Sequence, residues 1–117
     1  MNPEEHLQRF FAAWMRHDGN EMSGFYAPDA VMEDPTLAAP RRGRGEIRCY
    51  YSEIFSELED PHHELLDHAH RGERVWFEWN FGSGGIDKPR VRYRGVSIQT
   101  LADGLIAHDA AFWTPHD

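Results

Sequence analysis

Residues 26–35 read YAPDAVMEDP, and they are followed by Gly43 and by the segment IRCYY at positions 47–51. This order predicts the end of a helix, a short strand over 31–33, a turn at Pro35 and then a second amphipathic helix. A turn of this kind can hold the carboxylate of Asp34 at the rim of an apolar pocket. Asp34 is therefore the first candidate for a catalytic residue.

The composition indicates one small domain, residues 1–117, with one core and room for a modest cavity. Aromatic residues make up 13% of the chain and include four Trp, which supply material for a core or for the wall of a pocket. The formal charge is −8, from 20 acidic against 12 basic residues, and it argues against a nucleic-acid partner. The basic stretch 41–44 is interpreted as a solvated loop, with binding of an anionic substrate group as the alternative.

Cysteine usage and hydropathy bear on the compartment. The one cysteine, Cys49, excludes an internal disulfide, fits a reducing compartment and is interpreted as a buried apolar residue. The N-terminus has no continuous apolar segment of the kind found in signal peptides, and no run approaches the ~20 apolar residues that span a bilayer. We expect a soluble cytoplasmic protein with no membrane partner.

Apolar spacing predicts three helices in the first half of the chain. The first helix carries a stripe at i, i+3, i+4 and i+7, formed by Leu7, Phe10, Phe11 and Trp14. We expect it to stop at Gly19 and a short second helix to cover 21–26. The third helix ends at Asp60-Pro61 and has one apolar face, formed by Ile47, Tyr50, Tyr51, Ile54 and Leu58.

The second half changes to the period of strands. Large apolar residues alternate with other side chains over 75–81, a strand is expected around 64–70, and the strands 91–101 and 105–113 are joined by a hairpin at Asp103-Gly104. Helices followed by a meander of strands predict an α+β fold with a curved antiparallel sheet. The residues expected to support the curvature are Gly82, Gly84, Gly85 and Gly95.

Alternation also predicts which side chains share a face of the sheet. The apolar residues of 75–81 are expected to share one face with Ile98, Ile106, Ala110 and Phe112. The opposite face would then hold Trp76, Tyr93 and Trp113, so neither face resembles ordinary solvent-exposed surface. We expect helices to cover one face and a second copy of the chain to cover the other, giving a homodimer through the outer face of the sheet.

This arrangement resembles the NTF2-like superfamily of cone-shaped α+β proteins, which includes ketosteroid isomerases and SnoaL-type polyketide cyclases. The ketosteroid isomerase pattern is carried by Gln8-Arg9-Phe10, Tyr26-Ala27-x-Asp29-Ala30, Glu33-Asp34-Pro35, Gly43 and Ile47-Arg48-x-Tyr50-Tyr51. The resemblance covers nearly the whole chain. It implies three N-terminal helices packed on a curved antiparallel sheet that encloses a pocket.

The resemblance also implies roles for individual residues. Asp34 falls on the general base of the isomerases, which moves a proton between carbons beside a ketone. The two hydrogen-bond donors of the oxyanion hole correspond to Phe10 and Ser97, so efficient steroid isomerisation is not expected. Two matching tyrosines, Tyr26 and Tyr51, are expected to supply a substitute donor.

By the same alignment the pocket face of the sheet holds four polar residues: Glu78, Asn80, Ser97 and Asp109. Asp109 opposite Asp34 would form a pair of carboxylates in an apolar cavity, where one tends to stay protonated and the two can act as base and acid. The positions of the two aspartates of limonene epoxide hydrolase read Trp76 and Ala111, which disfavours that chemistry. The cavity itself would be shaped by Phe10, Trp14, Tyr50 and Trp113.

Less specific interpretations remain open beside these. Asp34 can be a solvated turn residue and Asp109 an exposed strand acid, while Glu78 can pair with Arg94 or Arg92 at a dimer rim. Asn80 and Ser97 can satisfy each other. The eight histidines lack a clear third ligand beside His68 and His70, so no metal site is predicted.

The sequence therefore predicts an enzyme that binds a small hydrophobic molecule bearing a carbonyl or hydroxyl group. It would perform isomerisation, dehydration or cyclisation by acid–base chemistry without a cofactor. The alternative is a noncatalytic module for ligand binding or dimerisation that has kept the scaffold and lost the chemistry.

Overall fold

The computed structural model describes residues 2–84 and 90–116, and it confirms the predicted α+β class. Its elements, in chain order, are α1 (Pro3–Trp14), α2 (Gly19–Ser23), β1 (Tyr26–Glu33), β2 (Arg41–Arg42), α3 (Gly43–Glu57), β3 (His62–Arg71), β4 (Arg74–Ser83), β5 (Val91–Ala102) and β6 (Leu105–Pro115). No helix of the described ranges is both long enough and apolar enough to cross a bilayer.

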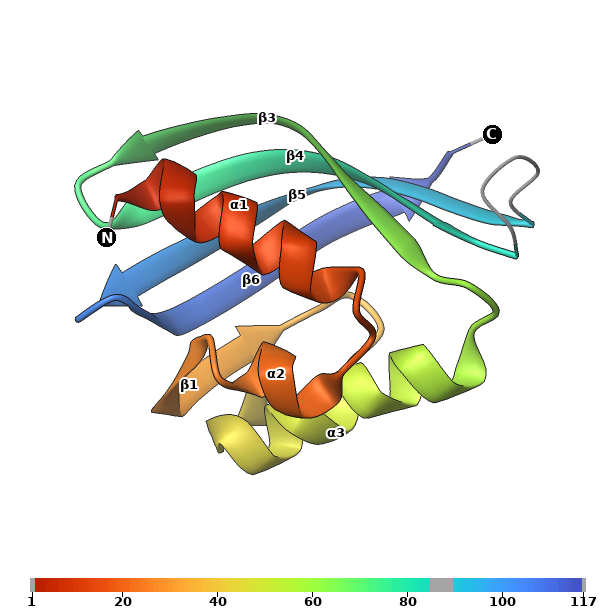
Figure 1. The fold of residues 1–117 in the computed structure, drawn as a ribbon, viewed down its shortest axis with the longest axis horizontal. Coiled ribbons are helices and arrows are strands. Elements are labelled where there is room, and N and C mark those ends of the chain that lie inside the picture. The colour runs from red at the N-terminus through yellow and green to blue at the C-terminus, as the bar shows by residue number, and fades with distance from the viewer. Residues whose placement is uncertain (1, 85–89, 117) are drawn as a thin grey trace.

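The strands form one curved sheet in the order β2-β1-β6-β5-β4-β3 (Figure 1). Four of the five strand pairs are antiparallel, as predicted, but β1 runs parallel to β6. A parallel neighbour needs a long crossover connection, and here the connection is most of the chain. The segment expected to be a three-residue strand is in fact an eight-residue strand, because β6 pairs with it at Tyr26 as well as at 31–33.

The N-terminal helices differ from the expected ones at their ends. Asn2 caps α1 by accepting a hydrogen bond from the Glu5 N–H at 2.8 Å. Gly19 does not end this helix but begins α2, because Asp18 caps α2 by accepting from two backbone N–H groups. A Cβ at Gly19 would lie 2.4 Å from the Ser52 hydroxyl, so glycine allows α2 to approach α3 closely.

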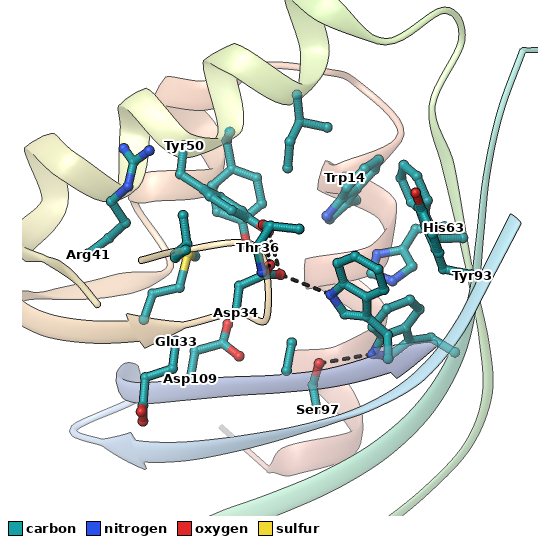
Figure 2. A pocket seen from close by; sticks show the side chains of 18 of the residues that line it. Trp14, Glu33, Asp34, Thr36, Arg41, Tyr50, His63, Tyr93, Ser97 and Asp109 are labelled. Atoms are coloured by element: carbon teal, nitrogen blue, oxygen red, sulfur yellow. Dashed lines mark hydrogen bonds between the residues drawn. The ribbon is translucent and has the colours of Figure 1, made fainter. Parts of the chain in front are cut away.

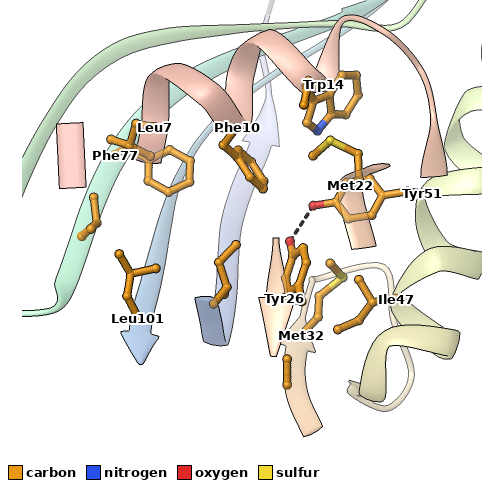
Figure 3. Packing of buried hydrophobic residues seen from close by; sticks show 14 of the residues in the cluster. Leu7, Phe10, Trp14, Met22, Tyr26, Met32, Ile47, Tyr51, Phe77 and Leu101 are labelled. Atoms are coloured by element: carbon orange, nitrogen blue, oxygen red, sulfur yellow. Dashed lines mark hydrogen bonds between the residues drawn. The ribbon is translucent and has the colours of Figure 1, made fainter. Parts of the chain in front are cut away.

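The hydrophobic core lies between the helices and the concave face of the sheet. Figure 1 shows α1 crossing this face, while α2 and α3 lie beside β1. Aromatic rings join the two layers, since Phe77 on β4 lies 6.4 Å from Phe10 and 5.6 Å from Phe11 between ring centroids. Figure 3 shows part of the buried cluster, which includes Leu7, Phe10, Trp14, Met22, Tyr26, Met32, Ile47, Tyr51, Phe77 and Leu101.

The predicted division of the sheet faces is largely wrong, because of the register between strands. Phe77 pairs with Ser97 and Ser97 with Ala111, so these three side chains share the concave face. Residues one position away point outward, and these include three that were expected inside: Ile98, Ala110 and Phe112. Tyr93 and Trp113, which were expected outside, line the concave face, and Ile106 is in the core as predicted.

Gly95 is required by the close approach of two tryptophan side chains. A Cβ at this position would lie 2.6 Å from the Trp79 ring, 2.6 Å from the Phe112 carbonyl oxygen and 2.7 Å from the Trp113 Cβ. Gly85, which was also expected to support the curvature, lies outside the described residues. Cys49, which was expected to be buried, is exposed on α3, because the buried face of that helix is formed by Ile47 and Tyr51.

Candidate active site

A cavity of about 530 Å³ lies between α1, α3 and the concave face of the sheet. Its volume is within the usual range for small-molecule sites. Nine of the residues that line it are aromatic: Phe10, Trp14, Tyr50, Tyr51, Phe77, Trp79, Phe81, Tyr93 and Trp113. Five carboxylates line the cavity: Glu33, Glu53 and Glu57, which are exposed, and Asp34 and Asp109, which are not (Figure 2).

Asp34 is half-buried directly after β1 and is surrounded by hydrogen-bond donors. Its Oδ1 accepts from the Thr36 backbone N–H at 2.9 Å and from the Thr36 hydroxyl at 2.5 Å. Its Oδ2 accepts from the Tyr50 hydroxyl at 3.0 Å and from the Trp113 indole N–H at 3.2 Å. These four donors hold the carboxylate in one orientation and stabilise its negative charge.

The parallel pairing of β1 and β6 brings the second carboxylate to the same region. Met32 pairs with Asp109, and Asp34 lies two residues farther along, which corresponds to about 7 Å in the strand direction. Met32, Asp34 and Asp109 all line the cavity. The predicted juxtaposition of two acids is therefore present in the structure, although their catalytic roles remain predictions.

Asp109 is 7% exposed and has a different environment from Asp34. Its Oδ2 accepts from the Tyr26 hydroxyl at 2.6 Å and from the Gln99 amide at 3.1 Å. Oδ1 has no hydrogen-bond partner within 2–84 and 90–116, so this oxygen is available to a ligand. Burial raises the pKa of Asp109 to about 6, with a smaller rise from the charge of Asp34, while the bonds from Tyr26 and Gln99 and the nearby His108 act in the opposite direction.

A chain of buried hydrogen bonds supports Asp109 from both sides. On one side the His6 Nε2–H donates to the Gln99 Oε1 at 2.7 Å, so the Gln99 amide group is left to donate to Asp109. On the other side the Tyr51 hydroxyl donates to the Tyr26 hydroxyl at 2.6 Å, which itself donates to Asp109. Burial lowers the pKa of His6, so its ring is neutral at pH 7.

The prediction that Tyr26 donates to a pocket ligand is wrong. Tyr26 is fully buried beneath the cavity wall, and its hydroxyl is bound to Asp109. Tyr51 does line the cavity, but its hydroxyl proton is directed to Tyr26. Burial raises the pKa of both phenols well above the ordinary value, so they remain protonated and act as fixed donors.

Two further predicted pocket residues, Glu78 and Asn80, lie on the outer face of the sheet and do not line the cavity. Strand alternation gives the inward positions of β4 to Phe77, Trp79 and Phe81. Glu78 forms an ion pair with Arg94 at 2.7 Å. A pairing of Glu78 with Arg94 or Arg92 was the alternative that the sequence left open.

Ser97 faces the cavity, but it does not pair with Asn80. Its hydroxyl accepts from the Trp79 indole N–H at 2.9 Å. The other predicted cavity residues, Phe10, Trp14, Tyr50 and Trp113, do line the wall. Phe10 has no polar group to offer a ligand.

Several residues of the site were not predicted, above all Gln99, His6 and His63. Gln99 occupies the same face of β5 as Ser97, two positions away, and that alternation was a usable signal. His6 lies one position before the apolar stripe of α1 and had no distinguishing pattern. His63 lines the cavity among aromatic rings, and burial lowers its pKa to about 3.

Neither the predicted absence of a metal nor that of a cofactor is tested by the structure. Within the described ranges no three His, Cys, Asp or Glu side chains converge in a way that could hold a metal ion. His108 is hydrogen-bonded to Glu33 across β1 and β6, with its Nε2 2.6 Å from the Glu33 Oε2.

Known proteins resemble this chain over most of its length. A curated relative, the steroid Δ-isomerase of Nocardioides simplex, is 31% identical over 97 residues, which are 82% of this chain and 76% of the relative. Among solved structures, a protein with a ketosteroid isomerase-like fold from Catenulispora acidiphila, in complex with trimethylamine, superposes with a TM-score of 0.84 at 20% identity, over 97% of this chain and 88% of that one. The epoxide hydrolase/cyclase-like enzyme SalBIII, which has a role in pyran ring formation in salinomycin, superposes with a TM-score of 0.79 at 22% identity, over 95% and 89% of the two chains.

These likenesses confirm the predicted NTF2-like fold. The family model for the SnoaL-like domain matches residues 7–109, a span that includes most of α1, the turn at Asp34 and Asp109 itself. The chain therefore belongs to the SnoaL-like domain family.

Proposed function

We propose that this protein is an enzyme that binds a small hydrophobic molecule bearing a carbonyl or hydroxyl group and moves protons on it without a cofactor. The observation that supports this proposal is the pair of carboxylates on one aromatic-walled cavity. Asp34 is surrounded by donors that stabilise its charge, whereas burial raises the pKa of Asp109 to about 6. Two carboxyl groups with different environments are suited to the separate roles of base and acid.

In an isomerisation, the Asp34 carboxylate removes a proton from a carbon beside the substrate carbonyl. The protonated Oδ1 of Asp109 gives its proton to the carbonyl oxygen, and an enol forms. Asp34 then returns its proton to a second carbon, and Asp109 recovers its proton as the carbonyl re-forms. The step needs no oxidant or external proton, because both carboxyl groups end as they began.

This assignment also accounts for the changed oxyanion hole. Phe10 cannot donate, and Ser97 is bound to Trp79. A protonated Asp109 would supply the missing donor from another strand, with Tyr26 and Gln99 holding its second oxygen. The 31% identity to a steroid Δ-isomerase favours a carbonyl substrate and isomerisation over cyclisation or dehydration.

The test is turnover of a panel of β,γ-unsaturated steroidal and bicyclic ketones, followed by the absorbance of the conjugated product. Asp34→Asn and Asp109→Asn should each lower kcat/KM by roughly 10²–10⁴. Glu78→Gln is the matched control, because this acid lies on the same sheet but on the outer face, and it should leave the rate within twofold.

The pH dependence follows from Asp109. Because its pKa is raised to about 6, the acid form is present below that pH and is lost above it. We expect kcat/KM to fall about tenfold per pH unit above pH 6. A protein that binds the ketones but turns none of them over, or variants that retain the wild-type rate, would favour the noncatalytic module instead.

A further inference from the structure

Several hydrogen-bond donors of the cavity wall are already used within the protein. The Tyr50 hydroxyl and the Trp113 indole N–H donate to Asp34. The Trp79 indole N–H donates to Ser97. Tyr51 donates to Tyr26. These groups hold the protein together and are not free to bind a ligand.

Trp14 is the exception among the indoles of the cavity wall. It is 4% exposed, it lines the cavity, and its Nε1–H has no hydrogen-bond partner within the described parts of the chain. Figure 2 shows the nitrogen of Trp14 on the side of the ring that faces the cavity. An indole N–H that borders a cavity and is not bonded within the protein can donate to an acceptor atom of a ligand there.

A second unpaired polar group lies beside it. The rings of Trp14 and His63 are 4.9 Å apart between centroids, and both nitrogens of His63 are buried without a partner. The ring of His63 is enclosed by aromatic neighbours, with Trp79 at 4.7 Å and Phe11 at 5.0 Å. Burial lowers the pKa of His63 to about 3, so this end of the cavity carries no cation and favours an uncharged acceptor over a carboxylate.

The two polar regions of the cavity are separated. Figure 2 shows Asp34 and Asp109 on one side and Trp14 and His63 on the other. Trp79 and Trp113 also line the cavity, and both side chains lie close to Gly95. A ligand that reaches both regions must therefore have an apolar, flat middle and a polar atom at each end.

We propose that the Trp14 indole N–H binds an uncharged acceptor oxygen at the end of the substrate remote from Asp34 and Asp109. The inference rests on the proposed role of the cavity as the substrate site, and it adds the substrate class. The substrate is an elongated apolar molecule with a carbonyl or hydroxyl oxygen at both ends.

The experiment uses the full chain and two steroid probes, androstenedione and its analogue that lacks the ring-D carbonyl. The indole N–H signals are observed by ¹⁵N NMR and assigned by Trp→Phe substitution. Androstenedione should move the Trp14 signal downfield, and the analogue should not. The Trp79 signal, already bonded to Ser97, is an internal control and should not move downfield with either probe.

Affinity gives the second measurement. Trp14→Phe keeps most of the ring and removes the donor, so it should weaken androstenedione binding roughly fivefold and that of the analogue less than twofold. Trp76→Phe, on the outer face of the sheet, is the matched control and should change neither affinity. An equal loss for both probes would show that Trp14 only packs, and a folded protein that binds neither probe would contradict the proposed substrate class.

The failure of this inference can be distinguished from the failure of the proposed function, because the Trp14 signal and turnover are measured independently. In Asp34→Asn and Asp109→Asn the Trp14 signal should still respond to androstenedione, although turnover is lost. A normal rate without any response of Trp14 would overturn only the present inference. A response of Trp14 in a protein without turnover would leave this inference standing and overturn the catalytic proposal.

Discussion

Asp109 shows how a buried acid can reduce stability while it prepares a site for chemistry. Its carboxyl group is enclosed by the cavity wall, and only Oδ2 is bonded, to Tyr26 and Gln99. Burial penalises the charged form, so the folded chain holds this proton up to about pH 6, whereas the ordinary pKa is 3.8. Because the pKa of Asp109 is higher in the folded chain than in the unfolded chain, its contribution to the free energy of unfolding is fully present below pH 3.8. That contribution is lost as the pH rises through 6.

Asp109→Asn should therefore stabilise the protein at pH 8 and have little effect at pH 3.5. The expected gain in the free energy of unfolding at pH 8 is roughly 2–3 kcal/mol, because the amide avoids burying a charge and its oxygen can still accept from Tyr26 and Gln99. Urea unfolding at the two pH values measures it. The control is Glu78→Gln, and an Asp109→Asn variant less stable than wild type at pH 8 would contradict the raised pKa.

Strands β5 and β6 owe their arrangement to two local features. Ala107 is an extra residue between the pairs Leu101–Ile106 and Thr100–His108, a bulge that keeps both Ile106 and Asp109 on the concave face. Gly95 lets β5 pass between Trp79 and Trp113. Together these features place a carboxyl group, a core side chain and the donor to Asp34 on one surface.

Gly95→Ala should destabilise the protein by about 1–3 kcal/mol, because the new methyl group would overlap the Trp79 ring and the Phe112 carbonyl. It should also weaken ligand binding, since displacement of Trp113 removes a donor from Asp34. Gly45→Ala is a control with the opposite expected effect. Gly45 lies in α3 with nothing within 4 Å of the new Cβ, so the substitution should raise the free energy of unfolding by up to about 1 kcal/mol. Thermal unfolding of both variants measures the difference, and equal melting temperatures would contradict the packing argument.

The outer face of the sheet has the character of a surface that another chain covers. Its centre is formed by Phe112, which is 59% exposed, by Val96, which is 40% exposed, and by the half-buried Trp76 and Ile98. The strand register places these side chains next to one another, with the pair Glu78–Arg94 beside them. The predicted homodimer through this face remains a prediction.

Sedimentation equilibrium tests it directly. We expect wild type to sediment as a dimer and Phe112→Glu to sediment as a monomer, because a carboxylate in an apolar interface is costly to bury. Met15→Glu is the control, since Met15 is 45% exposed at the end of α1 and away from the sheet. Wild-type protein that sediments as a monomer at high concentration would exclude this interface.

The features that the sequence predicted correctly depend on short-range order. The apolar stripe of Leu7, Phe10 and Trp14, the hairpin at Asp103-Gly104 and the turn at Asp34 follow from local sterics and from periods of 3.6 and 2. Those periods established the α+β class and placed Asp34 beside an apolar pocket.

Contacts between distant parts of the chain were decided only by the tertiary structure. Counting residues from the turn at Asp103-Gly104 pairs Gln99 with His108, but the bulge at Ala107 pairs it with Asp109. The parallel contact of β1 with β6 places Tyr26 on Asp109, where a donor to the pocket had been expected. A shift of one residue exchanges the two faces of a strand, and no local pattern encodes that shift. Tyr26 and Gln99, which bond to Asp109 and act on its pKa, could therefore be identified only once the pairing of the strands was known.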